Sequence, residues 1–311
     1  MSIDILGLGC TAIDELLYVD AYPAADGKAQ VRRRRRQCGG LTAMALAAAA
    51  RLGCRSAYAG TLGHDELSQF VLDWFQQEGI DTQYVCLRDD ARPIRSVVVV
   101  DESRQTRAIL FDTEGVFGAD PLWPQEELIR SARVLFVDHY GIEGMIRAAG
   151  VARSAGIPVI ADLEAGESPL LPDLLRLVDH LLLSRDFACS LSGETEPALA
   201  ARALWAAGRR AVVVTCGSDG CWHLSGHGGQ PLHQAAFAVH AVNTTGCGDV
   251  FHGAYAAALV DGLDVPAAVR FASAAAALKA AHCGAGAGLP SRAEVEALLN
   301  TPIQTKDSKR R

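Results

Sequence analysis

The chain has 311 residues, of which 50% are hydrophobic, so it can bury a large core as one domain with an appendage or as two domains. Its net charge of −7 argues against a general binder of nucleic acid or of membrane surfaces. Nine scattered cysteines contain no Cys-x-x-Cys pair, which favours reduced thiols over disulfides or a zinc site. There is no signal-peptide pattern, and apolar runs such as Ala43–Ala50 are too short to span a bilayer, so we expect a cytoplasmic protein.

Short β-branched runs alternate with Ala- and Leu-rich helical stretches along the chain. Repeated alternation of strand and helix predicts a parallel sheet that is covered by helices on both faces. The predicted strands are Ile3–Leu8, Ser56–Gly60, Val134–Asp138, Pro158–Asp162, His180–Ser184 and Ala211–Thr215.

Two segments, Glu15–Gln37 and Arg95–Asp112, break this alternation because both are strand-like with polar alternation. We interpret them as a small, partly exposed β-sheet that projects from the main body. Five consecutive arginines, Arg32–Arg36, fall inside the first segment. On a strand such a run divides its charges between two faces, which favours a solvated or interface-paired sheet over a nucleic-acid site.

A dinucleotide-binding alternative comes from Gly7, Gly9 and Ala12, which follow a predicted strand with the spacing Gly-x-Gly-x-x-Ala. That motif requires a helix directly after the glycines. Asp14–Pro23 instead alternates and ends in a proline, as a strand does. The sequence also lacks a Walker A motif, which excludes a P-loop kinase.

The segment Ala241–Ala254 carries the most chemical information. From Val250 the apolar residues recur at helical spacing as far as Gly262, a credible helix stop. The glycines in Gly246–Gly248 would therefore lie at a helix N-terminus, where unpaired N–H groups and the macrodipole favour an anion. Asp249 in the first turn is either a base for that site or a residue that only complements the dipole.

This segment resembles the second signature of the phosphofructokinase-B/ribokinase family of sugar kinases, written Asp-Thr-x-Gly-Ala-Gly-Asp-x-Phe. The resemblance implies that Gly246, Cys247 and Gly248 stabilise the transferred phosphoryl group through their backbone. It also implies that Asp249 accepts the proton of the acceptor hydroxyl. Asn243 stands where the family has its first Asp, close to a monovalent-cation site of some relatives, so we expect weak potassium activation or none.

The resemblance extends over about residues 3–300. It implies a ribokinase-like three-layer α/β/α sandwich, a β lid formed by about residues 15–37 and 95–112, a homodimer made through that lid, and a polar tail at 301–311. Asp14, Gly39 and Gly40 take the places of sugar-binding residues, whereas Met44 replaces the usual Asn. Lys28, in the turn into the lid, is a further substrate-binding candidate, and its alternative is an exposed lysine beside a turn.

For the nucleotide, the resemblance points to residues that follow strand ends and to an Ala-rich helix near the C-terminus. Ser184 and Phe187 stand where the family has Asn-x-x-Glu, an element that supports magnesium binding through water. We expect Asp162, Glu164 or Asp186 to compensate. An Ala-rich helix is expected to begin at Pro266 and to let Lys279 extend along it to solvent. The candidate ATP-binding residues are Ser184, Thr215, Gly217, Gly220, Ser273 and Gly284.

Together these features predict ATP- and Mg²⁺-dependent transfer of a phosphoryl group to a primary hydroxyl of a sugar or sugar derivative. The Ser184-x-x-Phe187 pattern and the Thr106–Thr113 lid strand look most like ketohexokinase and sulfofructose kinase branches, which favours a keto sugar. If Lys28 faces the pocket, with part of the Arg32–Arg36 run or His139 nearby, the acceptor carries an anionic group such as a sulfonate or carboxylate. The alternatives are a nucleoside kinase of the same fold and a catalytically silent, ligand-binding regulatory relative.

Overall fold

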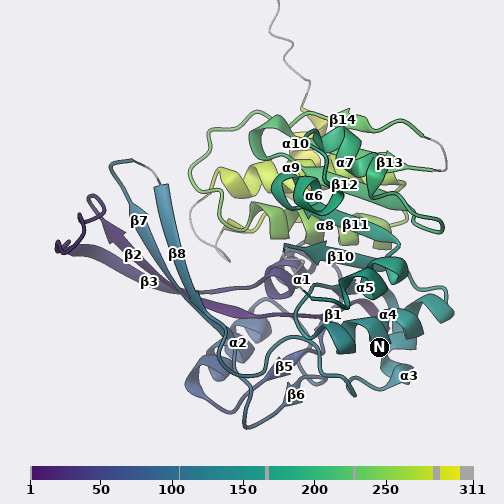
Figure 1. Cartoon of the computed structure of the whole chain (residues 1–311), viewed down its shortest axis with the longest axis horizontal. Helices are drawn as coiled ribbons and strands as arrows, with labels where there is room; N and C mark the ends of the chain where they lie inside the picture. Colours follow the sequence, from purple (N-terminus) through teal and green to yellow (C-terminus); the bar gives the residue numbers. More distant parts are fainter. Residues whose placement is uncertain (1, 105, 165–167, 227–228, 283–287, 302–311) are drawn as a thin grey trace, which may run out of the picture.

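A computed structural model describes residues 2–104, 106–164, 168–226, 229–282 and 288–301. Within them, an eight-stranded sheet forms the centre of an α/β body (Figure 1). The predicted tail at 301–311 lies, apart from its first residue, outside the described residues. In spatial order the strands are β14 (Leu232–Gln234), β13 (Cys221–Ser225), β12 (Ala211–Thr215), β11 (His180–Ser184), β10 (Val159–Leu163), β9 (Ala132–Val137), β1 (Ile3–Leu8) and β4 (Ser56–Tyr58).

All six predicted strands are present, and they pair in parallel. The sheet is parallel across these six strands but not throughout, because β12 and β13 pair antiparallel, as do β13 and β14. After Thr215 the chain turns back through the short 3₁₀ segment η1 (Gly217–Asp219) and Gly220, whose φ is 90°. Such a connection is too short for the helical crossover that a parallel partner requires.

Helices cover both faces of this sheet, because alternate strand residues point to opposite sides. In β1, Ile5 belongs to one core cluster, whereas Leu6 and Leu8 belong to the other. The three-layer α/β/α sandwich is therefore confirmed. On the Ile5 face lie α1 (Leu41–Arg51), α2 (Glu66–Gln77), α8 (Cys247–Val260), α9 (Val265–Ala280) and α10 (Arg292–Asn300). On the other face lie α3 (Glu126–Ser131), α4 (Ile142–Ser154), α5 (Leu171–Leu177), α6 (Arg185–Ser192) and α7 (Pro197–Ala203).

Small residues let α1 and α8 pack unusually closely. A Cβ atom on Gly253 would lie only 2.1 Å from the carbonyl oxygen of Ala45, so no larger residue fits there without displacing backbone. Met44, in the first turn of α1, is buried. Its Cε atom lies 3.7 Å from the place where a Cβ atom on Gly246 would stand. Met44 therefore packs beneath the N-terminus of α8 and fixes its position.

The two segments that break the strand–helix alternation form a second sheet, the lid, which extends away from the body (Figure 1). Its strands lie in the order β3 (Val31–Gly39), β2 (Ala12–Val19), β7 (Ile94–Asp101) and β8 (Thr106–Asp112). The central pair β2–β7 is parallel, and the outer pairs are antiparallel. A separate two-stranded sheet of β5 (Thr61–Leu62) and β6 (Cys86–Leu87) was not expected from the sequence.

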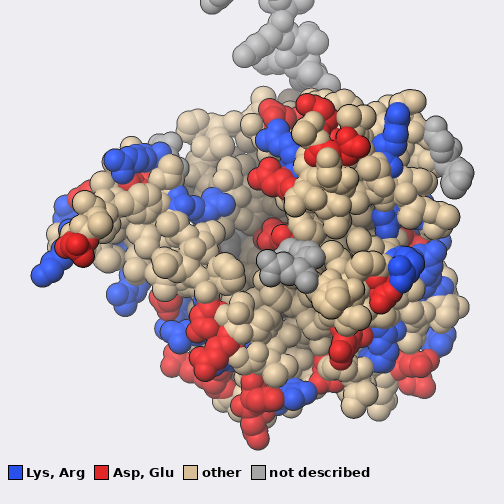
Figure 2. All heavy atoms as spheres, in the orientation of Figure 1, with Lys and Arg blue, Asp and Glu red and all other residues tan. Residues whose placement is uncertain are grey.

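The arginine run lies on β3, and several of its members pair with acids. Arg32 contacts Asp20 at 2.5 Å, and Arg36 forms ion pairs with Glu15 and with Glu66. Arg33 contacts Glu102 at 3.5 Å, and its guanidinium lies 3.8 Å from the centroid of the Tyr18 ring. Figure 2 shows acidic and basic side chains intermixed on the lid. This pattern matches the expected solvated or interface-paired sheet.

Two other expectations can be checked against the fold. β1 leads directly into β2 instead of a helix, so the Gly-x-Gly-x-x-Ala segment lacks the structure that dinucleotide binding requires. The eight cysteines in the described part of the chain are all free thiols. Within the same described ranges, no helix is both long and apolar enough to cross a membrane.

Candidate active site

Helix α8 begins where the sequence predicted, with Gly246 as its N-cap in the left-handed conformation at φ 78°. That conformation favours glycine because a side chain would be strained there. A Cβ atom on Gly248 would have no neighbour within 4 Å, so the chain is open to an incoming group at this position. The first turn of a helix carries N–H groups without intrahelical partners and the positive end of the macrodipole. The turn therefore offers a cradle for an anion.

Asp249 lies in this first turn and is the most electrostatically perturbed carboxylate of the site. Burial raises its pKa well above the ordinary value, and the carboxylates of Asp162, Glu164 and Asp14 raise it further. Lys279 acts in the opposite direction. A carboxylate whose pKa is raised is a stronger base than an ordinary Asp, which suits proton abstraction from a hydroxyl.

The candidate sugar-binding residues converge on Asp14 at the base of the lid. Its carboxylate accepts a hydrogen bond of 2.5 Å from the Ser96 hydroxyl of the neighbouring strand. A Cβ atom on Gly39 would lie 2.7 Å from Asp14 Oδ2, and Gly40 has a φ of 97° close against the backbone of Thr11. The Gly39-Gly40 pair therefore leaves space for the Asp14 carboxylate and lets α1 begin beside it.

The metal candidates lie at the carboxyl ends of β10 and β11. Asp162 is buried, and its Oδ2 atom is 2.6 Å from Nδ1 of His252 on α8. Glu164 is exposed, and partial loss of water and the nearby Asp162 carboxylate raise its pKa. Asp186 is exposed in the first turn of α6. Among the described residues, no group of three or more His, Cys, Asp or Glu side chains is placed to hold a metal ion by itself.

The nucleotide candidates lie mainly at the ends of adjacent strands, because Ser184 of β11 pairs with Thr215 of β12. The Ser184 hydroxyl caps α6 by accepting a hydrogen bond from the Phe187 N–H, and the Thr215 hydroxyl donates to the Leu183 carbonyl. The turn that follows contains Gly217 and Gly220, both with positive φ. This edge therefore presents backbone groups and glycines more than free side chains.

Of the two nucleotide candidates near the C-terminus, Ser273 lies within the described residues. Ser273 is buried in α9, and its hydroxyl donates to the Val269 carbonyl at 2.8 Å. Its hydroxyl is therefore occupied within the helix. Gly284 lies outside the described residues.

Two acceptor-side candidates have distinct surroundings. Lys28 is exposed in the connection between β2 and β3, next to a turn closed by Gly27 N–H and the Ala24 carbonyl. His139 follows β9, and its ring centroid lies 4.1 Å from that of Tyr140. Burial lowers the pKa of His139, with Asp162 acting in the opposite direction. His139 therefore lies at the same end of the sheet as Asp162, whereas Lys28 is exposed to solvent.

Sequence reasoning missed Arg107 and His252. Arg107 lies on β8, and its guanidinium is 3.5 Å from the Thr244 hydroxyl, just before the anion cradle. Cross-strand register places Arg107 beside Val100 and Tyr18, on the lid face that also carries Asp14. His252 could have been noticed because it follows Asp249 by three residues on a helix. Arg107 gave no comparable local signal.

The expectation that Lys279 extends to solvent is wrong. The side chain is fully buried, and its Cε atom lies 4.0 Å from the position of a Cβ on Gly246. Packing of α9 against α8 encloses this side of the helix, so the stem runs between helices toward the anion cradle. An Ala-rich surface pattern does not reveal such burial, because the neighbouring helix supplies it.

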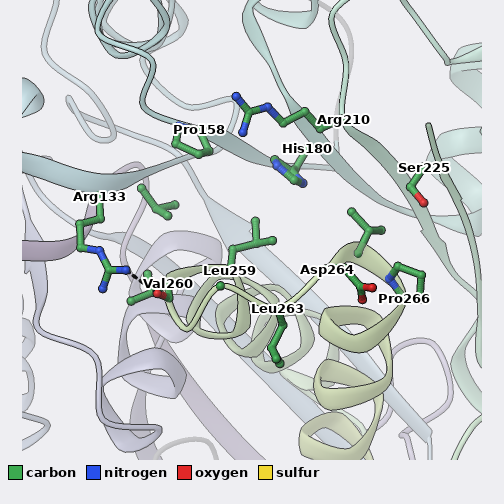
Figure 3. Close-up of a pocket in the computed structure, with 13 residues that line it drawn as sticks. Arg133, Pro158, His180, Arg210, Ser225, Leu259, Val260, Leu263, Asp264 and Pro266 are labelled. Atoms are coloured by element: carbon green, nitrogen blue, oxygen red, sulfur yellow. Dashed lines mark hydrogen bonds between the residues drawn. The ribbon is translucent and has the colours of Figure 1, made fainter. Parts of the chain in front are cut away.

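A cavity of about 640 Å³ lies at the opposite end of the parallel strands from Asp249. Its lining includes Arg133, His180 and Arg210 near strand starts, and Leu259 and Pro266 around the α8–α9 connection (Figure 3). No candidate site residue lines it. The candidate active site instead lies beside the hollow between lid and body that is visible in Figure 2.

Comparisons with known proteins show the family to which the chain belongs. A family model described as pfkB family carbohydrate kinase matches residues 5–292. The ribokinase of Haemophilus influenzae is 28% identical over 264 residues, covering 82% of this chain and 85% of that protein. The ribokinase of Bacillus subtilis is 27% identical over 300 residues, covering 96% and 99%. The structure of Arabidopsis thaliana ribokinase complexed with ribose and ATP has a TM-score of 0.84 at 26% identity, covering 96% of this chain and 99% of that one. Because the family match spans nearly the whole length, the chain belongs to the pfkB family of carbohydrate kinases.

Proposed function

We propose that this kinase transfers the γ-phosphoryl group of ATP to a primary hydroxyl of a sugar or sugar derivative, with Asp249 as the base. The observation that carries the proposal is the position of Asp249, half-buried in the first turn of α8, directly after the open Gly246–Gly248 backbone. In phosphoryl transfer the protein acts mainly by positioning and by stabilising charge. A base and an anion cradle on one helical turn supply both at the same point.

The acceptor would bind between the lid and the start of α8. Asp14, oriented by Ser96, would accept hydrogen bonds from sugar hydroxyls, and the close backbone of Gly39 and Gly40 would bound the pocket. Asp14 lies near enough to Asp249 for the two charged carboxylates to repel each other, which raises the pKa of Asp249. Closure of the lid over the acceptor would exclude water and prevent hydrolysis of ATP.

ATP would lie along the edge formed by the ends of β11 and β12, with its phosphates directed at α8. Ser184, Thr215, Gly217 and Gly220 are held on this edge by the parallel pairing of the two strands. The related ribokinase of Arabidopsis thaliana was solved with ribose and ATP, which supports both ligand classes here.

Magnesium fits the donors that are present. Mg²⁺ usually keeps several waters and binds one or two carboxylates together with substrate phosphates. Asp162 and Glu164 would supply those carboxylates, through water, and Asp186 is the third candidate. When bound, the ion neutralises charge on the phosphates. Asp162 would lie beside His252, whose ring nitrogen is 2.6 Å away.

The acceptor class that we favour is a keto sugar. If that sugar also carries an acidic group, Arg107 is the cation best placed to bind it. Arg107 lies on the same lid face as Asp14 and contacts Thr244 beside the cradle. An anionic acceptor would need such a partner to offset its lost hydration. Lys28 is the second candidate for that role.

We further propose a homodimer formed through the lid. The outer lid face exposes Val97 and Leu110, and β8 is an open edge strand. Exposed apolar residues on an edge strand are commonly covered by a partner. Sedimentation equilibrium should give twice the chain mass, and a monomer at assay concentration would contradict the proposal. A reducing cytosol suits the free thiols.

The test of the activity is ADP release across a panel of sugars, ketoses, sugar acids and nucleosides, with mass spectrometry of the product. We expect phosphorylation of a sugar at a primary hydroxyl, dependent on ATP and magnesium. Preference for a nucleoside would favour the nucleoside kinase alternative. Ligand binding without any phosphorylated product would favour the silent regulatory alternative, against which the intact Gly246–Asp249 segment argues.

A further inference from the structure

Lys279 is a fully buried lysine that the proposed mechanism does not use. Burial of an ammonium group is costly unless opposite charge lies close by. The pKa values of Asp249 and Cys247, the two residues that flank Gly248, are raised mainly by loss of water, and the charge of Lys279 is near enough to oppose both shifts. Its charge is therefore felt at the anion cradle.

Two segments outside α9 contact the chain at Lys279 and at the residue that follows it. The carbonyl of the next residue, Ala280, accepts hydrogen bonds from the N–H groups of Val242 and Asn243 at 2.7 and 3.0 Å. These bonds tie the end of α9 to the segment that leads into the cradle. On the other side, a Cβ atom on Gly288 would lie 3.5 Å from Lys279 Cε, so the stem is enclosed there as well.

The nearby carboxylates make most of the charge around this position negative, although Arg107 also acts on Cys247 as a cation. Asp249 is surrounded by Asp14, Asp162 and Glu164, and all three raise its pKa. A phosphoryl group transferred here would bring further negative charge into a buried, low-dielectric site. A fixed cation behind the backbone would stabilise that charge without any reorganisation during the reaction.

We propose that Lys279 is the fixed cation of the anion cradle: its buried ammonium group stabilises the negative charge of the transferred phosphoryl group from behind the Gly246–Gly248 backbone. It acts through space and is a positioning residue rather than one that touches the reacting atoms. The inference rests on the proposed kinase site. A site that carries its own cation requires no added monovalent ion, which agrees with the neutral Asn243 side chain, whose oxygen accepts the Thr245 N–H at 2.9 Å.

The experiment compares the wild type with Lys279→Ala, Lys279→Met and the control Leu278→Ala in the full-length protein. Leu278 is a partly buried neighbour on the same helix, so its truncation removes packing but no charge. We expect Lys279→Ala to lose roughly 10²–10³ in kcat, as for loss of a stabilising donor in an oxyanion hole. Leu278→Ala should lose far less of its kcat, although its melting temperature should be similar to that of Lys279→Ala.

Cation rescue provides a readout that a purely structural role would not move. At constant ionic strength, potassium or methylammonium should restore much of the activity of Lys279→Ala, because both fit the space that the side chain leaves. Neither should restore Lys279→Met, whose side chain fills that space, and the wild type should hardly respond. The acidic limb of the kcat/KM profile of Lys279→Met should also move to higher pH, because Asp249 loses the charge that lowers its pKa.

The possible failures are distinguishable. If the wild type phosphorylates no acceptor, the proposed function fails. The inference about Lys279 is wrong, and the proposed function stands, if the wild type is active but a folded Lys279→Ala retains its kcat. The same conclusion follows if the kcat of Lys279→Ala falls only as far as that of Leu278→Ala and added cations do not restore it. Strong, saturable potassium activation of the wild type would also overturn the inference.

Discussion

Nδ1 of His252 lies 2.6 Å from Oδ2 of Asp162, and this contact joins helix α8 to the carboxyl end of β10. His252 follows Asp249 by one turn, so the helix that presents the proposed base also contacts Asp162, the carboxylate that most raises the pKa of Asp249 apart from burial. The base and the proposed metal side are thus built on one helix, and a change on either side should affect both.

Gly248 tests the anion cradle. Gly248→Val should weaken nucleotide use and lower turnover, because a branched side chain would obstruct the backbone where phosphate approaches. Gly150→Val is a matched control, since that helical glycine also has free space around it but lies on α4. ATP affinity by calorimetry and kcat are the measurements. If both survive in Gly248→Val, the cradle lies elsewhere.

The acceptor charge can be tested with Arg107 and Lys28. Arg107→Gln should lower kcat/KM for sulfofructose or 2-keto-3-deoxygluconate by roughly tenfold to a hundredfold relative to fructose, because a charged hydrogen bond is lost. Lys28→Ala should change neither ratio, since Lys28 is exposed. A selective loss in Lys28→Ala alone would transfer the role to Lys28. If Arg107→Gln loses kcat/KM equally with neutral and anionic acceptors, a neutral ketose remains the favoured substrate.

His180 makes stability depend on pH at the far end of the sheet. Burial lowers its pKa from 6.5 to about 4, while its Nδ1 atom lies 2.9 Å from the Tyr255 hydroxyl. The neutral ring is favoured in the fold, so stability is complete above pH 6.5 and declines as pH falls toward 4, by about 3 kcal/mol at most. The free energy of unfolding, measured with urea at several pH values in this range, should depend less steeply on pH in His180→Gln than in the wild type. An unchanged slope would contradict the assignment.

The sequence predicted the strands and the start of α8 well, because local patterns encode them. Glycine spacing and the helical recurrence after Val250 located the cradle, and β-branched runs located six parallel strands. The antiparallel edge was missed because β13 and β14 are short and partly polar. Their pairing depends on the turn at Gly220 more than on periodicity.

The remaining site residues depend on contacts between distant segments. Arg107 reaches Thr244 across 137 positions, and which lid face points inward is set by strand register, not by the residues of β8. Lys279 was misplaced because an Ala-rich helix does not show which side another helix will cover. Sequence patterns therefore predicted the start of α8 and the carboxylates near it, but not the positions of Arg107 and Lys279.

The most direct test of the account is the turnover of Asp249→Asn with the preferred sugar. Asparagine preserves the shape and hydrogen bonding of the side chain but cannot accept the proton, so kcat should fall by roughly 10²–10⁴ while ATP affinity changes little. Turnover near that of the wild type in the folded variant would show that Asp249 is not the base.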